Sequence, residues 1–254
     1  MELRIKAVTD TGCVRDHNED RILIGDEILR EGDKEIEINL NDNPKYFVAI
    51  ADGMGGHNAG EVASEMVLEL MREKINSFES GLTENELSKK IKDWTYEIHS
   101  HILEEGNRSP ERKGMGTTLV GILCYENSAY YLNVGDSRLY RLRDECLVQI
   151  SKDHSLRELT GDNNLPSNII LNSFGGGDKV FVDFAPVSKR IFEGDILLLC
   201  SDGLSDMLTD DEIEMILNSG EDSVNKLLTE AKNKGGEDNI SIISITIGMN
   251  GNLS

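Results

Sequence analysis

Apolar residues recur at every second position, or in runs of about five, along much of the chain, and this pattern predicts short β-strands. The strands are expected at residues 3–7, 21–24, 46–51, 117–125, 129–134, 139–142, 147–150, 180–185, 196–200 and 240–247. Residues 34–40 alternate strictly after Glu31-Gly32-Asp33, so we expect a solvent-facing hairpin, inserted at about residues 26–45.

The apolar period changes to 3.6 in other segments, which predicts helices with one buried face. Two such faces contain Ala63, Met66, Val67, Leu70, Met71 and Ile75, and then Leu87, Ile91, Trp94, Ile98 and Ile102. Capping boxes at residues 83–86 and 209–212 begin the second and third helices. Asp222 is expected to begin a fourth helix, which ends near Gly235-Gly236.

The order of these elements indicates the fold class. Strands come in groups and helices in two adjacent pairs, unlike the strict alternation that builds a parallel sheet. We therefore expect an α+β fold: a four-layer α/β/β/α sandwich with two central antiparallel sheets flanked by helix pairs. No Pro-rich or low-complexity linker interrupts the pattern, so residues 1–254 are expected to form a single domain.

Charge and composition exclude several classes of partner. The formal net charge is −21, which repels nucleic acid and anionic membrane surfaces. The longest apolar runs, such as residues 196–200, are far shorter than the roughly 20 residues of a membrane span. No secretory signal is visible at the start, and the four cysteines show no paired spacing. We expect reduced core or near-core thiols in a cytoplasmic protein.

Acidic residues stand at the ends of five predicted strands. Asp52, Asp136 and Asp202 each follow an apolar strand, whereas Asp238 and the pair Glu19-Asp20 each precede one. A single Asp-Gly after a strand is usually only a turn. Five such groups in one cleft would repel one another unless a cation compensated them. Oxygen ligands without a Cys/His cluster favour Mg²⁺, Mn²⁺ or Ca²⁺, although periodicity alone cannot show that the carboxylates converge.

The Gly-rich segment 52–60 and the histidines are less specific. The segment lacks the Gly-Lys-Ser/Thr of a phosphate-binding P-loop, and it is not a dinucleotide fingerprint. His57, beside Asp52, is either a catalytic group or a turn-stabilising side chain. We expect His99 and His101 on the surface of a helix, and His154 gives no indication by itself.

Six motifs in order resemble a known family. They are Gly12-x-x-Arg15-x-x-Asn18-Glu19-Asp20, Asp52-Gly53-Met54-Gly55-Gly56-His57, Gly114-Met115-Gly116-Thr117-Thr118, Gly135-Asp136-Ser137-Arg138, Ser201-Asp202-Gly203-Leu204-x-Asp206 and Glu237-Asp238-Asn239. This set is similar to the metal-dependent serine/threonine protein phosphatases, the PPM family or phosphatase type 2C, in their compact bacterial form. The resemblance covers residues 3–248, and it implies the same four-layer fold with metals in the cleft at one end of the sandwich.

The resemblance also implies a role for individual residues. Asp52 corresponds to a carboxylate that bridges two metals, Gly53 to a carbonyl ligand, and Asp202 and Asp238 to further direct ligands. Glu19 and Asp20 correspond to acidic groups that act on the second metal largely through water. Asp136 and Asp206, with Asp202, correspond to a third and weaker metal site. Arg15 corresponds to the arginine that grips the substrate phosphate.

The implied reaction is hydrolysis of phosphoserine and phosphothreonine in proteins, opposing a serine/threonine kinase. A water that bridges two Mg²⁺ or Mn²⁺ ions becomes a hydroxide nucleophile and attacks phosphorus in line. The resemblance implies phosphorylated proteins as partners and a monomeric enzyme.

This chain departs from the family pattern at three places. His57 lies three residues farther from Asp52-Gly53 than the acid histidine of many members. The segment 26–45 is long, and the flap at about residues 154–174 is short. The alternatives to an active phosphatase are a catalytically weak, phosphoprotein-binding regulator of the same fold and a Ca²⁺-binding structural protein. The matched carboxylates are all present, and the twelve-residue loop typical of helix–loop–helix calcium sites is absent from the sequence.

Overall fold

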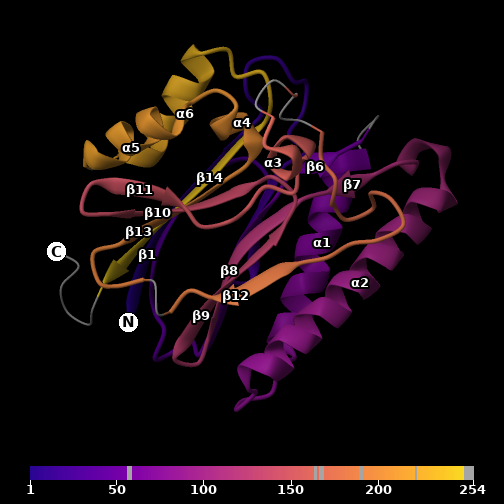
Figure 1. Ribbon diagram of the computed structural model, residues 1–254, viewed down its shortest axis with the longest axis horizontal. Coiled ribbons are helices and arrows are strands. Elements are labelled where there is room, and N and C mark those ends of the chain that lie inside the picture. Colours follow the sequence, from indigo (N-terminus) through magenta and orange to yellow (C-terminus); the bar gives the residue numbers. More distant parts are fainter. Residues whose placement is uncertain (56–58, 163–164, 166–168, 189–190, 221, 249–254) are drawn as a thin grey trace.

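Two six-stranded antiparallel sheets form the centre of the computed structural model, which describes residues 1–55, 59–162, 165, 169–188, 191–220 and 222–248 (Figure 1). In order, the first sheet contains β11 (Cys146–Gln149), β10 (Arg138–Arg143), β13 (Ile196–Cys200), β14 (Ile240–Gly248), β1 (Glu2–Asp10) and β4 (Gly32–Asn39). The second contains β12 (Asp183–Pro186), β9 (Ser128–Val134), β8 (Leu119–Tyr125), β5 (Lys45–Ala51), β2 (Arg21–Ile24) and β3 (Glu27–Leu29).

One helix pair covers the outer face of each sheet (Figure 1). Helices α1 (Ala59–Asn76) and α2 (Glu84–Arg108) lie on the second sheet, and α5 (Asp210–Asn218) and α6 (Ser223–Asn233) lie on the first. The short elements are β6 (Gly53–Met54), β7 (Gly116–Thr117), α3 (Leu156–Thr160), α4 (Asp202–Ser205) and the 3-10 helix Pro110–Arg112. This arrangement confirms the predicted four-layer sandwich.

Three apolar layers separate the four layers of structure. Strand β14 shows why: Ile240 and Ile242 face the helix layer, whereas Ile243 and Ile245 face the other sheet. Successive side chains of a strand point to opposite faces, so a strand covered on both sides is apolar at nearly every position. The continuous run in β13 has the same cause.

The inserted segment 26–45 does not form the separate solvent-facing hairpin that its alternation predicted. Strand β4 pairs with β1 from Glu2 opposite Asn39 to Thr9 opposite Gly32, while β3 pairs with β2 in the other sheet. Ile36 and Ile38 turn toward the apolar layer between the sheets. Their burial, together with the backbone hydrogen bonds of β1, makes the segment an edge strand rather than an exposed hairpin.

Other local expectations have mixed outcomes. Both capping boxes form, at Thr83 with Glu86 and at Thr209 with Glu212. Asp222 stands before α6, but its backbone is left-handed and its side chain accepts no backbone N–H of the helix. The expected strand 180–185 begins only at Asp183.

The four cysteines are all free thiols. Cys124 and Cys200 are buried as expected, whereas Cys13 and Cys146 are exposed and do not belong to the core. In the described part of the chain, no helix combines the length and the apolar character that a membrane crossing requires.

Candidate active site

The strand register brings the predicted acidic residues to one end of the sandwich. In one sheet Arg21 pairs with Ala51 and Leu119 with Val134, and in the other Arg138 pairs with Cys200 and Asp10 with Ile240. Glu19, Asp20, Asp52, Asp136, Asp202 and Asp238 each lie within two residues of one of these strand ends. At this end of the molecule lie β6, β7 and α4 (Figure 1).

Asp52 leaves β5 in a backbone conformation that its neighbours fix. Its carbonyl accepts hydrogen bonds from Thr118 N at 2.9 Å and Thr117 Oγ1 at 2.8 Å. The next residue, Gly53, packs so closely that a Cβ atom there would lie 2.3 Å from Gly60 O. Only glycine fits this approach of β6 to the first turn of α1. The Asp52-Gly53 peptide is therefore held on a rigid support.

Glu19 and Asp20 are held from the opposite sheet. Ser201 Oγ donates to Asp20 Oδ2 at 2.8 Å. Asn239 Oδ1 accepts from Glu19 N at 2.8 Å, and Asn239 Nδ2 donates to two carbonyls of the β1–β2 loop. The sequence alone assigns no role to Asn239, although it stands in the last of the six motifs. It connects the turn before β14 to the turn before β2.

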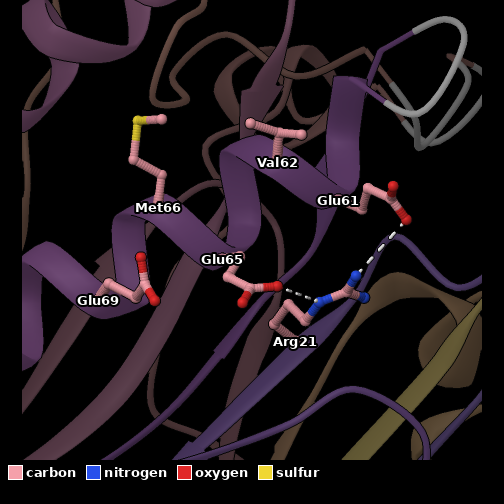
Figure 2. A pocket seen from close by; sticks show the side chains of 6 residues that line it. All are labelled: Arg21, Glu61, Val62, Glu65, Met66 and Glu69. Atoms are coloured by element: carbon pink, nitrogen blue, oxygen red, sulfur yellow. Dashed lines mark hydrogen bonds and ion pairs between the residues drawn. The ribbon is translucent and has the colours of Figure 1, made fainter.

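The buried arginine Arg21 supports the same turn, and its side chain lies against α1 (Figure 2). The Arg21 side chain is 7% exposed, and its Nη1 donates to the carbonyls of Asn18 and Asp20 at 2.7 Å each. Its other nitrogens face α1, with Glu65 at 3.3 Å and Glu61 at 3.6 Å. Together with Val62, Met66 and Glu69, these residues line a surface pocket. Arg21 therefore forms ion pairs with Glu61 and Glu65 of α1, and with none of the strand-end carboxylates.

The strand-end carboxylates raise one another's pKa. Burial, followed by the neighbouring carboxylates, raises the pKa of Asp20 to about 8 and that of Asp136 to about 8. The same two causes raise the pKa of Asp202 to about 6 and that of Asp52 well above its ordinary value. Asp52 and Asp202 remain partly open to solvent. The four groups therefore disfavour one another's ionisation at this end of the sandwich.

These residues suit a hard divalent cation. Asp136 Oδ1 is buried and accepts no hydrogen bond from any described residue. Among the described residues, no three Asp, Glu, His or Cys side chains are arranged so that they could hold a metal ion together. A cation among these carboxylates would supply the positive charge that bound protons supply in its absence. Carboxylate and backbone carbonyl oxygens are the ligands that Mg²⁺ and Mn²⁺ prefer.

Arg15 lies beside the strand-end carboxylates and not among unrelated surface residues. Its Nη2 donates to Asp238 Oδ2 at 2.6 Å, and its side chain is 51% exposed. Asp206 lies at the end of α4, where its N–H donates to Asp202 O at 2.7 Å, and its charge raises the pKa of Asp202 and Asp136. His57 falls outside the described residues.

Two histidines differ from the sequence-based expectation. His99 is 1% exposed instead of lying on the surface, because the loop at Gly175 crosses α2 and donates its N–H to His99 Nδ1 at 3.2 Å. His101, two residues on, is exposed as expected. His154, for which the sequence gives no indication, has a buried ring that contacts the turn before Asp136. No local pattern indicates such burial, because distant loops cause it.

Comparisons with known proteins agree with this geometry. The sequence model of the family described as Protein phosphatase 2C matches residues 33–235. The serine/threonine phosphatase stp of Listeria monocytogenes is 36% identical over 250 residues, which cover 93% of each chain. The S. agalactiae serine/threonine phosphatase structure has a TM-score of 0.80 at 30% identity, over 96% of this chain and 99% of that one.

A further solved structure concerns the metal directly. It is the catalytic domain of the serine/threonine protein phosphatase PstP in complex with two manganese ions. It aligns with a TM-score of 0.75 and 30% identity, over 98% of this chain and 100% of that chain.

Proposed function

The chain belongs to the protein phosphatase 2C family, and from that membership and the strand-end carboxylates we infer a metal-dependent protein serine/threonine phosphatase. It hydrolyses phosphoserine and phosphothreonine in proteins with Mg²⁺ or Mn²⁺ as cofactor. The observation that carries this function is the group Asp20, Asp52 and Asp136, which no ion pair from a described Lys or Arg reaches. A buried carboxyl group without a partner is costly to ionise, so a site that retains three of them is built for a cation.

We propose that Asp52, the Gly53 carbonyl, Asp202 and Asp238 hold two metals directly. Glu19 and Asp20 would act largely through water, and Asp136 with Asp206 would form a third, weaker site. When bound, the metals activate a water molecule for attack and neutralise charge on the phosphoryl oxygens.

The chain's own residues orient the substrate and the ligands. The Thr117 and Thr118 hydrogen bonds fix the backbone carbonyl of Asp52 and so the chain position from which its carboxylate extends. Arg15 pairs with Asp238, and once a cation compensates that carboxylate, the planar guanidinium is available for two phosphoryl oxygens. Orientation of the phosphate by Arg15 would then favour in-line attack.

The physiological setting is also part of the proposal. The substrates are phosphorylated proteins, products of an opposing serine/threonine kinase, and the enzyme acts as a monomeric single domain over residues 1–254. Four free thiols support a reducing, cytoplasmic location. The regulator alternative is not favoured, because every matched carboxylate is present.

The test is phosphate release from a phosphothreonine peptide by the purified chain. Activity should require Mn²⁺ or Mg²⁺, stop when a chelator is added and return when metal is restored. Full activity after thorough removal of metal would contradict the proposed function, and so would no activity at any metal concentration.

A further inference from the structure

The His154 ring connects the turn at Gly135-Asp136 with residues of the segment that follows β11. Its side chain is 6% exposed and lies 4.5 Å, centroid to centroid, from the ring of Phe181. His154 exchanges two hydrogen bonds with Gly135: its N–H donates to Gly135 O at 2.9 Å, and Gly135 N donates to its Nδ1 at 3.1 Å. Gly135 immediately precedes Asp136. The histidine thus holds both polar backbone groups of the residue next to a proposed metal ligand.

The same side chain and backbone reach the far end of the flap. Leu171 N donates to His154 O at 2.8 Å, and Asn172 Nδ2 lies 2.7 Å from His154 Nδ1. Asn172 is itself oriented, because its Oδ1 accepts from Phe181 N at 3.0 Å and its Nδ2 donates to Phe181 O at 2.9 Å. Nε2 of His154 lies 3.3 Å from Asp183 Oδ2 at the start of β12.

These contacts define the tautomer of His154. Two donors, Gly135 N–H and the amide of Asn172, face Nδ1, so that nitrogen must be the unprotonated acceptor. The proton of a neutral ring then sits on Nε2, where Asp183 accepts it. The two ring nitrogens therefore have different roles, because Nδ1 fixes the turn and Nε2 fixes the ring to β12.

The Gly135 turn needs such a support. Its backbone has φ +114°, a conformation that glycine tolerates, and it packs on Thr118, whose hydroxyl lies 2.7 Å from that of Ser137. Asp136 Oδ1 is buried and has no hydrogen-bond partner among the described residues, so no side-chain contact of that atom orients the carboxylate. Its direction depends on the backbone of the turn.

We propose that His154 is a positioning residue that sets the orientation of Asp136 through Gly135 and couples it to the flap segment at Leu171 and Asn172. The proposal rests on the proposed function, because Asp136 matters there as a ligand of the weaker third metal. Removal of a residue that hydrogen-bonds to a metal ligand typically changes metal affinity by about 10- to 100-fold. None of the contacts between the His154 side chain and the described residues is with the side chain of a proposed metal ligand, so its effect should appear in weak metal binding more than in the two tight sites.

Two variants of similar shape separate the roles of the ring nitrogens. In His154→Asn the amide oxygen stands near the position of Nδ1 and can still accept from Gly135 N. In His154→Gln the amide reaches the position of Nε2 and can still donate to Asp183, but Gly135 N loses its acceptor. Asp183→Asn is the matched control, because its amide oxygen still accepts from Nε2.

The measurements are calorimetric Mn²⁺ titration and amide hydrogen exchange at Gly135 and Leu171, together with the thermal unfolding midpoint. In His154→Gln we expect about 10-fold weaker binding in the weak Mn²⁺ phase and faster exchange at Gly135, with tight binding unchanged. In His154→Asn and Asp183→Asn we expect values within about 3-fold of wild type. The Mn²⁺ concentration for half-maximal activity should follow the same order.

Two results would overturn the positioning role. One is wild-type Gly135 exchange and weak Mn²⁺ affinity in His154→Gln. The other is an equal loss in both His154 variants that follows only their unfolding midpoints. If the wild-type chain released no phosphate, the proposed function would fail, whereas the exchange and calorimetry of the variants would still decide the role of His154.

Discussion

Arg21 lies between two groups of acidic residues, and the two groups differ in whether arginine side chains pair with them. On the α1 side, Glu65 is paired with Arg30 and Arg21, and these partners lower its pKa. On the cleft side, burial raises the pKa of Asp20 to about 8, although Arg21 is the next residue in the chain. The guanidinium donates to the carbonyl of Asp20. Its ion pairs are with Glu61 and Glu65 of α1 (Figure 2). Arg21 and Arg30 thus compensate Glu65 on α1, whereas no described Lys or Arg forms an ion pair with Asp20.

The largest expected effect comes from Asp52→Asn, which removes one uncompensated charge and keeps the shape. We predict a loss of activity of about 100-fold or more. Loss of a residue that only supports a metal ligand typically costs about 10- to 100-fold, and loss of a ligand itself should cost at least as much. Tight Mn²⁺ binding should weaken in calorimetry. In chelator, however, the variant should unfold at a higher temperature than wild type at pH 8, because one buried repulsion is gone. Near-normal activity with unchanged metal binding would remove Asp52 from the site.

Arg15→Ala tests the arginine that pairs with Asp238, a carboxylate at the end of a strand. Loss of a charge-assisted bidentate contact, worth roughly 1.5–3 kcal/mol, predicts a 10- to 100-fold lower kcat/KM for a phosphopeptide. Metal affinity should not fall, because Arg15 competes with a cation for Asp238. Arg15→Lys should recover only part of the rate, since an ammonium group lacks the planar fork. Unchanged steady-state kinetics in the alanine variant would leave phosphate recognition to the metals alone.

The smallest effect on activity is expected from Glu65→Gln, in the compensated group. Arg21 and Arg30 would lose a charged partner, so the free energy of unfolding should fall by about 1–3 kcal/mol. Activity at saturating Mn²⁺ should stay within about 2-fold of wild type, because Asp20 keeps its carbonyl contact with Arg21.

Glu69→Gln is the matched control for this variant. Glu69 lines the same pocket and is exposed, so its replacement should change stability by less than about 0.5 kcal/mol in denaturant titration. A Glu65 variant that lost activity as strongly as Asp52→Asn would show that the two acidic groups do not differ in function.

The sequence predicted elements better than it predicted contacts between them. Local patterns were sufficient for both capping boxes, for the apolar strands and for the acidic residues at their ends. The pairing of β4 with β1 and the burial of His99 depend on partners that are distant in the chain. Convergence of the carboxylates came from the family resemblance, because periodicity places residues on a face but does not place strand ends in space. The contacts of Arg21 with α1 had no sequence signal.

Asp20, Asp52 and Asp136 have no ion pair with a described Lys or Arg, and we expect them to remain without a counter-charge until a divalent cation binds; the pH dependence of unfolding tests this. The folded pKa of Asp136 is about 8, against an ordinary value of 3.8, so between these values the folded protein holds more protons than the unfolded chain. In chelator, stability should therefore fall as pH rises from about 5 to 8, by an amount on the order of a few kcal/mol.

The decisive measurement is the free energy of unfolding between pH 5 and pH 8, in chelator and in saturating Mn²⁺. We expect stability in chelator to decrease with pH and the added stability from Mn²⁺ to increase with pH, since the metal binds the deprotonated carboxylates. Asp52→Asn should flatten both trends. A chelated protein that is equally stable at both ends of the range, with a Mn²⁺ effect independent of pH, would contradict the account.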